Sequence, residues 1–382
     1  KIDMTQHLLN RFMRIYPPYA VGLILMLTLA GMICDGPLCE SIIYKRQSTC
    51  RDVWWTNALC VHNIYPGLLK SCMSHTWYVA TDLQLFVFLS PLIIIGLRES
   101  KRATIWTIVG ITCSSVILIF TLTVAKELKT ENLLFDRASD AQDYYDSLYT
   151  EPYSRLGPWG IGLLFGVLMD NQKKNKLTLK KEHIIIMWVL CGTALVSMPL
   201  ADTPFQQDDY EYSSIEAGLY NSLSRPIWSL GICWIIFACS AGYAGPVNDF
   251  LSSQMFQLMG KLSYSAYLIH KIVVNLYFAG LRSPIYISPS QQVTLILGLI
   301  VQSFLVSFIF YLIAEIPFVH IAKFILQRER HRTRSEPTAN ANKQESTDCR
   351  PSAFDALELG SARLSQFYPE QNQNLNLNDS LK

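Results

Sequence analysis

The sequence lacks the short motifs that identify many soluble enzymes. No P-loop, metal-ligand spacing, serine-hydrolase elbow or haem motif occurs in its 382 residues, so we expect no metal site and no bound cofactor. Charge is scarce as well. Only 16% of the residues are Asp, Glu, Lys or Arg, and the net charge of +2 gives no indication of a nucleic-acid partner.

A signal peptide is also lacking at the start of the chain. The sequence begins with Lys1 rather than Met, and polar Asp3, Thr5 and Gln6 follow where an apolar segment would be needed. We therefore expect that this chain has a truncated N-terminus.

Apolar residues are abundant, because half of the chain is hydrophobic and the mean hydropathy is positive. This composition indicates a polytopic membrane protein. Eight runs are long enough to cross a bilayer as helices: 15–34, 77–97, 104–125, 153–169, 184–200, 219–243, 256–278 and 292–317. The fourth is short and the fifth is broken near Pro199, so either is compatible with a tilted or partly re-entrant helix. The predicted fold is an all-α integral membrane bundle of about eight transmembrane helices within residues 1–325.

The Lys and Arg residues of the connections predict the orientation of these helices. Alternate connections collect sixteen of them on one side and eight on the other, and the richer side is expected to be cytoplasmic. Both ends of this chain then lie in the cytoplasm, in a multi-pass protein of the plasma membrane or an endomembrane. Residues 326–382 are rich in Asn, Gln and Ser and are expected to form a disordered cytosolic tail.

The cysteines fall into two groups. Cys39, Cys50, Cys60 and Cys72 lie in a polar loop, residues 35–76, with Cys34 at its edge, whereas Cys113, Cys191, Cys233 and Cys239 lie in apolar runs. We interpret the loop set as disulfide-forming, in the lumen or outside the cell, and the cysteines of the runs as packing residues.

Charged and ionisable side chains inside or beside the apolar runs are the candidate functional residues, because such groups are costly in a bilayer. By depth they form an outer layer of His75, Asp82, Arg225, His270 and Lys271, and an inner layer of Arg11, Arg14, Lys261 and Glu315. Asp82 and Arg225 are expected to lie at matched depth and to form an ion pair. That pair would be either a structural clasp between helices or part of a site.

Three further candidates each have two interpretations. His270 is suited to proton relay or to binding a polar substrate group, but a histidine in this position also serves commonly in packing. Arg11 and Arg14 are either cytoplasmic anchors or, being three residues apart on a helix, a phosphate-binding pair. Glu315 either ends the last helix and pairs with Lys261 or takes part in the inner layer.

Six blocks, taken together and in order, resemble the type-three acyltransferase family, in its animal branch named for nose resistance to fluoxetine. They are RFMRIYPPY at 11–19, HTWYVATDLQLFVFLSP at 75–91, YSRLGPWGIGLLFGVLM at 153–169, SRPIWSLGICWIIFACSAGYAG at 224–245, LMGKLSYSAYLIH at 258–270 and AEIPF at 314–318. Nearly everything between Arg11 and Phe318 takes part in the resemblance.

The resemblance implies an integral-membrane enzyme that passes an acyl group from a cytosolic acyl-CoA to an acceptor at the membrane or beyond it. It implies donor handling by Arg11 and Arg14, and a catalytic histidine on a span that precedes them and is not in this sequence. The animal branch is also associated with drug response and with lipid or yolk transport.

The predicted function is therefore an acyltransferase that moves an acyl group from acyl-CoA to a hydroxyl-bearing acceptor in contact with membrane lipids. Its expected catalytic residues are Asp82 and His270, and its expected substrate-binding residues are Arg11, Arg14, His75, Arg225 and Lys261. The alternatives are a transport protein of the same fold that carries a lipophilic cargo, and a non-catalytic scaffold.

Overall fold

The structure of the chain is a computed structural model that describes residues 4–67, 70–130, 142–175, 178–207, 211–286, 288–322 and 324. Within these ranges it is helical and contains no strand. The expected all-α fold is therefore confirmed for this part of the chain. The expected tail at 326–382 lies outside the described residues.

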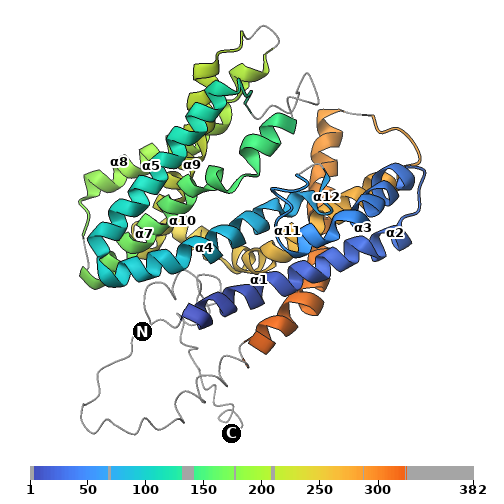
Figure 1. Cartoon of the computed structure of the whole chain (residues 1–382), viewed down its shortest axis with the longest axis horizontal. Coiled ribbons are helices and arrows are strands. Elements are labelled where there is room, and N and C mark those ends of the chain that lie inside the picture. The colour runs from blue at the N-terminus through green and yellow to red at the C-terminus, as the bar shows by residue number, and fades with distance from the viewer. Residues whose placement is uncertain are drawn as a thin grey trace, which may run out of the picture.

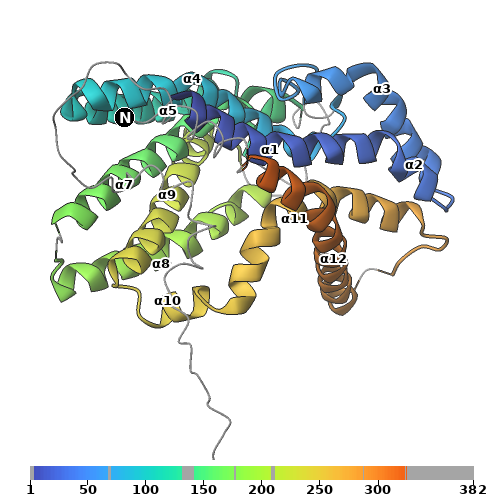
Figure 2. The same cartoon turned by 90° about the horizontal axis from the view of Figure 1, so that it is seen from below.

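Four long helices form one group, which occupies the same side of the molecule in both overall views (Figures 1 and 2). They are α5 (Lys101–Ala125), α7 (Leu156–Asn175), α8 (Lys181–Leu200) and α9 (Ser214–Ala241). α9 packs against each of the other three. Short turns flank them: η4 (Tyr145–Tyr149), η5 (Pro152–Arg155) and η6 (Thr203–Gln206).

The second group contains the two ends of the helical region. Its members are α1 (Met4–Leu27), α2 (Leu29–Ile33), η1 (Glu40–Tyr44), α3 (Lys45–Ala58), α11 (Gln254–Ala279), α12 (Pro289–Phe310) and η7 (Tyr311–Glu315). α10 (Pro246–Leu251) follows α9 and leads the chain back from the first group. α1 packs on α3, α11 and η7, so the first and last helical segments lie together.

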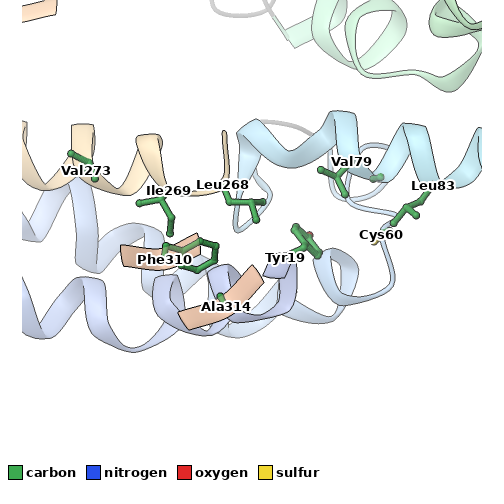
Figure 3. Packing of buried hydrophobic residues seen from close by; sticks show 10 residues of the cluster. Tyr19, Cys60, Val79, Leu83, Leu268, Ile269, Val273, Phe310 and Ala314 are labelled. Atoms are coloured by element: carbon green, nitrogen blue, oxygen red, sulfur yellow. The ribbon is translucent and has the colours of Figure 1, made fainter. Parts of the chain in front are cut away.

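α4 (Trp77–Glu99), preceded by η3 (Ser74–Thr76), connects the two groups. Its first half contributes Val79 and Leu83 to a buried cluster with Tyr19 of α1 and Leu268 of α11 (Figure 3). Its second half packs on α5 of the first group. Pro91 lies inside the helix between these halves, and a proline there removes one backbone hydrogen bond.

Five helical segments are long and apolar enough to cross a membrane: Ser74–Glu99, Lys101–Ala125, Lys181–Phe205, Ser214–Ala241 and Pro289–Ala322. The other three expected runs are also helical, within α1, α7 and α11, but they do not meet this criterion in the described residues. α1 and α11 carry internal charges, such as Arg11 and Lys271, that lower their hydropathy. The count of eight spans is thus not confirmed.

The outer faces of these helices are strongly apolar. On α8 the exposed large side chains include Ile185, Ile186, Val189, Leu190 and Val196, and on α12 they include Val293, Ile296, Leu297, Val301, Leu305 and Ile309. A water-soluble protein rarely exposes so large a contiguous apolar surface. These faces have the composition required for contact with lipid chains.

The expected polar loop is an ordered cap on α1. Tyr19 donates a hydrogen bond to the backbone oxygen of Asn57 at 3.0 Å, and Gln47 donates one to the backbone oxygen of Met26 at 3.1 Å. These contacts hold α3 against the buried side of α1.

Two disulfides, Cys34–Cys39 and Cys50–Cys72, confirm that the loop cysteines form bridges. The inclusion of Cys60 was wrong, because its thiol is free and buried in the cluster that holds Val79 and Leu83. Cys34, expected only at the edge of the set, is bonded instead. Burial raises the pKa of the Cys60 thiol to about 11, which makes it a packing residue.

Candidate functional site

An ion pair joins α1 to α4. Arg11 donates from Nη2 to both carboxylate oxygens of Asp82, at 2.7 and 2.9 Å. The guanidinium carbon of Arg11 also lies 4.5 Å from the centre of the Phe86 ring, one helical turn further along α4. The two charged side chains are 30% and 22% exposed, so the pair is only partly hydrated.

This contact corrects the expected separation of charges into two layers. Arg11 was placed at the inner face and Asp82 near the outer face, which would keep them far apart. The helix that carries Arg11 begins at Met4 rather than at Ile15, and it lies alongside α4 over its first turns. Arg11 is therefore inside the bundle, at the depth of Asp82.

Asp82 also lines a cavity of 540 Å³ between α4 and the first helix group. Aromatic and apolar side chains form most of the wall, among them Tyr78 of α4, Trp159 of α7 and Trp228 of α9. Arg155 and Arg225 line the same cavity from η5 and α9. It thus combines an apolar wall with two guanidinium groups and one carboxylate.

The expected ion pair between Asp82 and Arg225 does not form. Asp82 is bonded to Arg11, and Arg225 donates from Nη2 to the hydroxyl oxygen of Tyr144 at 3.1 Å. The two residues nevertheless line one cavity, and the choice of partner was wrong. A nearer cation, Arg11, takes the carboxylate.

Arg155 is a residue of the cavity that sequence reasoning missed. Its guanidinium carbon lies 4.7 Å from the ring centre of Trp77 and 5.3 Å from that of Tyr149, and its Nη2 donates to the Tyr149 backbone oxygen at 3.0 Å. It stands at the start of the fourth apolar run, inside the block YSRLGPWG. An arginine at the edge of an apolar run was the available signal, but edge arginines are also ordinary membrane anchors.

His75 and His270 lie together at the junction of α4 and α11, with ring centres 5.2 Å apart and ring planes nearly perpendicular. Their bonds assign the protons, because a backbone carbonyl oxygen can only accept. His75 donates from Nε2 to Leu268, and His270 donates from Nδ1 to Tyr267 at 2.8 Å. In the neutral imidazoles, Nδ1 of His75 and Nε2 of His270 are then the nitrogens that carry the lone pairs.

The inner candidates have neighbours other than those expected. Glu315 is buried and accepts a 2.7 Å hydrogen bond from Ser265, so the expected pairing with Lys261 is wrong. Lys261 is exposed on α11. Arg14 lies within electrostatic range of Glu315, whereas Arg11 is bound to Asp82. The two arginines of the Arg-x-x-Arg element thus have different neighbours.

The described residues contain no group of three or more His, Cys, Asp or Glu side chains placed to hold a metal ion. What the structure brings together is Arg11 with Asp82, His75 with His270, and Asp82, Arg155 and Arg225 around one cavity.

Comparisons with known proteins agree with the resemblance. A sequence model of the family described as "Acyltransferase domain" matches residues 1–312. The chain is 26% identical over 331 residues to Nose resistant to fluoxetine protein 6 of Caenorhabditis elegans, a match that covers 84% of this chain and 40% of the relative. It is 24% identical over 311 residues to Regulator of hypoxia-inducible factor 1 of the same organism, with 76% and 59% covered. No solved structure matches the chain.

Proposed function

Because the chain belongs to the acyltransferase-domain family, a family of membrane proteins, we propose that it transfers an acyl group from acyl-CoA to a hydroxyl-bearing acceptor within the membrane. The family match over residues 1–312 and the five helices able to cross a bilayer support this proposal. The chain spans 40% and 59% of the length of the two relatives, so the activity proposed is that of the whole protein.

One observation carries the proposal: Asp82 is bonded to Arg11 and also lines the cavity. Arg11 belongs to the Arg-x-x-Arg element, which the family resemblance associates with the acyl donor. A donor phosphate bound at Arg11 and Arg14 would therefore lie beside the cavity wall. Phosphate oxygens and a carboxylate compete for the same guanidinium nitrogens, so donor binding would release the Asp82 carboxylate into the cavity.

In this proposal the acceptor oxygen attacks the thioester carbonyl carbon, the new C–O bond forms and the C–S bond breaks. A histidine takes the hydroxyl proton and returns it to the departing thiolate. The resemblance implies that this histidine precedes Arg11. His270, with a free Nε2, and His75 beside it would hold the acceptor side. Lys261 would add a cation near the donor.

The proposal includes the topology: eight spans, both ends of this chain in the cytoplasm, and the disulfide-bonded cap outside or in a lumen. The cytosolic location of acyl-CoA requires Arg14 to be reachable from the cytoplasmic face. The Lys and Arg asymmetry of the connections supports this orientation.

A second candidate is a carrier of a lipophilic cargo with the same fold. The lining of the cavity favours it, because most of the wall is aromatic or apolar and suits a lipophilic molecule. In a carrier, the ion pair would hold α1 to α4 while cargo occupies the cavity.

The experiment is acyl-CoA binding and acyl transfer by the purified, reconstituted full-length protein, with a library of hydroxyl acceptors. Arg11→Lys with Arg14→Lys keeps both charges but loses two-nitrogen contacts, so donor affinity should fall about tenfold. Arg282→Lys, at an exposed surface pair with Asp35, is the matched control and should bind as the wild type does. Arginine-dependent binding without turnover would favour the carrier, and absence of acyl-CoA binding in folded protein would exclude the proposed enzyme.

A further inference from the structure

We propose that the cavity between α4 and the first helix group binds an amphipathic acid, a molecule with one anionic head and an apolar tail of one or two long chains. Arg155 and Arg225 would hold the head, and the aromatic wall would hold the chain. This inference goes beyond the proposed acyl transfer, since it requires neither acyl-CoA nor turnover.

The two arginines of the cavity wall favour the binding of an anion. Arg155 and Arg225 form no ion pair with any residue of the described ranges, whereas Asp82 is already neutralised by Arg11. Within the described part of the chain, these two positive charges of the cavity have no compensating carboxylate. An unpaired charge on a partly buried side chain is unfavourable, and a bound anion removes that cost.

The two guanidinium groups converge on one place. Arg155 lies 5.3 Å and Arg225 5.8 Å, measured from the guanidinium carbon, from the centre of the same Tyr149 ring. Aromatic faces stabilise guanidinium groups without using their N–H donors. The charges are thus held near one another by a ring, and no carboxylate of the described residues pairs with them.

Each of the two arginines also has an unused hydrogen-bond donor. Arg155 Nε and Arg225 Nη1 are buried and have no acceptor within the described part of the protein. Buried donors normally have partners, and each one without a partner destabilises the protein. A carboxylate or phosphate head offers two or three acceptor oxygens, which small rotamer changes of these side chains would reach.

The other side chains of the cavity wall favour a ligand with a long apolar tail over a small ion. Trp159, Trp228, Leu85 and Ile232 line the cavity, which at 540 Å³ is of the size that holds drug-sized apolar molecules. Tyr78 and Tyr220 add rings with polar ends. A free inorganic phosphate would leave this apolar surface uncovered, so the chemistry of the wall favours an amphipath.

The anionic head is either a fatty-acid carboxylate or a phospholipid phosphate, and both accept hydrogen bonds from guanidinium groups.

The test uses the full chain, purified in an uncharged maltoside detergent. The probe is 9,10-dibromostearic acid, whose bromines quench nearby tryptophans such as Trp159 and Trp228. The matched probe is the corresponding dibromo alcohol, which has the same chain and no charge.

We expect the acid to quench tryptophan fluorescence saturably and to bind at least about tenfold more tightly than the alcohol, since charge-assisted hydrogen bonds distinguish them. Arg155→Gln with Arg225→Gln should abolish this preference, and Arg282→Gln should not change it. Arg225→Lys keeps the charge and should lose only part of it. Displacement by oleate or by dioleoyl phosphatidic acid then identifies the source of the head.

Equal binding of acid and alcohol by the wild-type protein would overturn the proposal, and this comparison needs no variant to fold. Preference for the acid that survives in the folded double glutamine variant would also overturn it, because the charge recognition would then lie elsewhere. Either result leaves acyl transfer untouched, so the two proposals fail separately.

Discussion

The bond between Arg11 and Asp82 allows a quantitative test of how α1 and α4 are joined. Changing either residue to alanine strands the other charge at a site that is only 30% or 22% exposed. Two unit charges about 4 Å apart attract by about 4 kcal/mol at an effective dielectric constant of 20, and fully exposed pairs contribute at most about 1 kcal/mol. The partial exposure places the expected coupling between these limits, at about 2 kcal/mol.

The assay is a double-mutant cycle on the free energy of unfolding, measured for the purified protein by titration with a denaturing detergent. We expect Asp82→Ala and Arg11→Ala each to destabilise the protein by about 2–3 kcal/mol. The double variant should lose about 2 kcal/mol less than the sum of the two. Exchanging the two residues should restore part of the stability.

A second cycle serves as the control. Asp82 and Arg225 line one cavity without contact, so their alanine variants should be additive within about 0.5 kcal/mol. The reasoning would be refuted by additivity in the first cycle, or by a larger coupling of Asp82 to Arg225 than to Arg11.

Two other predictions concern the ordered cap. Burial lowers the pKa of His62 from 6.5 to about 4, so between these pH values the unfolded chain binds a proton that the folded chain does not. The free energy of unfolding should therefore fall by up to about 3 kcal/mol as the pH falls through this window. The variant His62→Gln should lose that part of the pH dependence. Thermal unfolding measured from pH 7.5 to 4 checks it, and an unchanged slope in the variant would contradict it. For the thiols, a membrane-impermeant alkylating reagent applied to intact cells should label the half-buried Cys34 only after reduction, and the buried Cys60 only after unfolding. Labelling of Cys60 in the folded protein would show that it is not buried.

The apolar runs predicted most of the helices, because helix length and hydropathy are local properties of the chain. The start of the first helix was missed. Residues 4–14 are polar enough to resemble a cytosolic flank, but they continue the helix to Ile15 and beyond. Since this extension determines the depth of Arg11, the error in one boundary became an error in the partner of Asp82.

Contacts between distant segments were the least predictable feature. Nothing in the local sequence of Arg155 distinguishes a cavity residue from a membrane anchor, because its role depends on Trp77 and Tyr149, which other segments supply. The pairing of Cys34 instead of Cys60 is similar, since it depends on how the cap folds over α1. The juxtaposition of His75 and His270, by contrast, agrees with the common outer layer that their positions predicted.

The position of Pro91 in α4 has a mechanical consequence. The residues before it contact α1 and α11 and also η5 of the first group, and the end of the helix after it lies next to α5, so rotation of one helix group against the other would act on this helix. Pro91 provides no N–H to the preceding turn, and bending stiffness is therefore lowest close to it. Asp82 and the other α4 residues of the cavity precede this weak point, on the half of α4 that contacts both α1 and η5. Bending at Pro91 would therefore move the end of α4 that leads to α5 while leaving the ion pair between Arg11 and Asp82 intact.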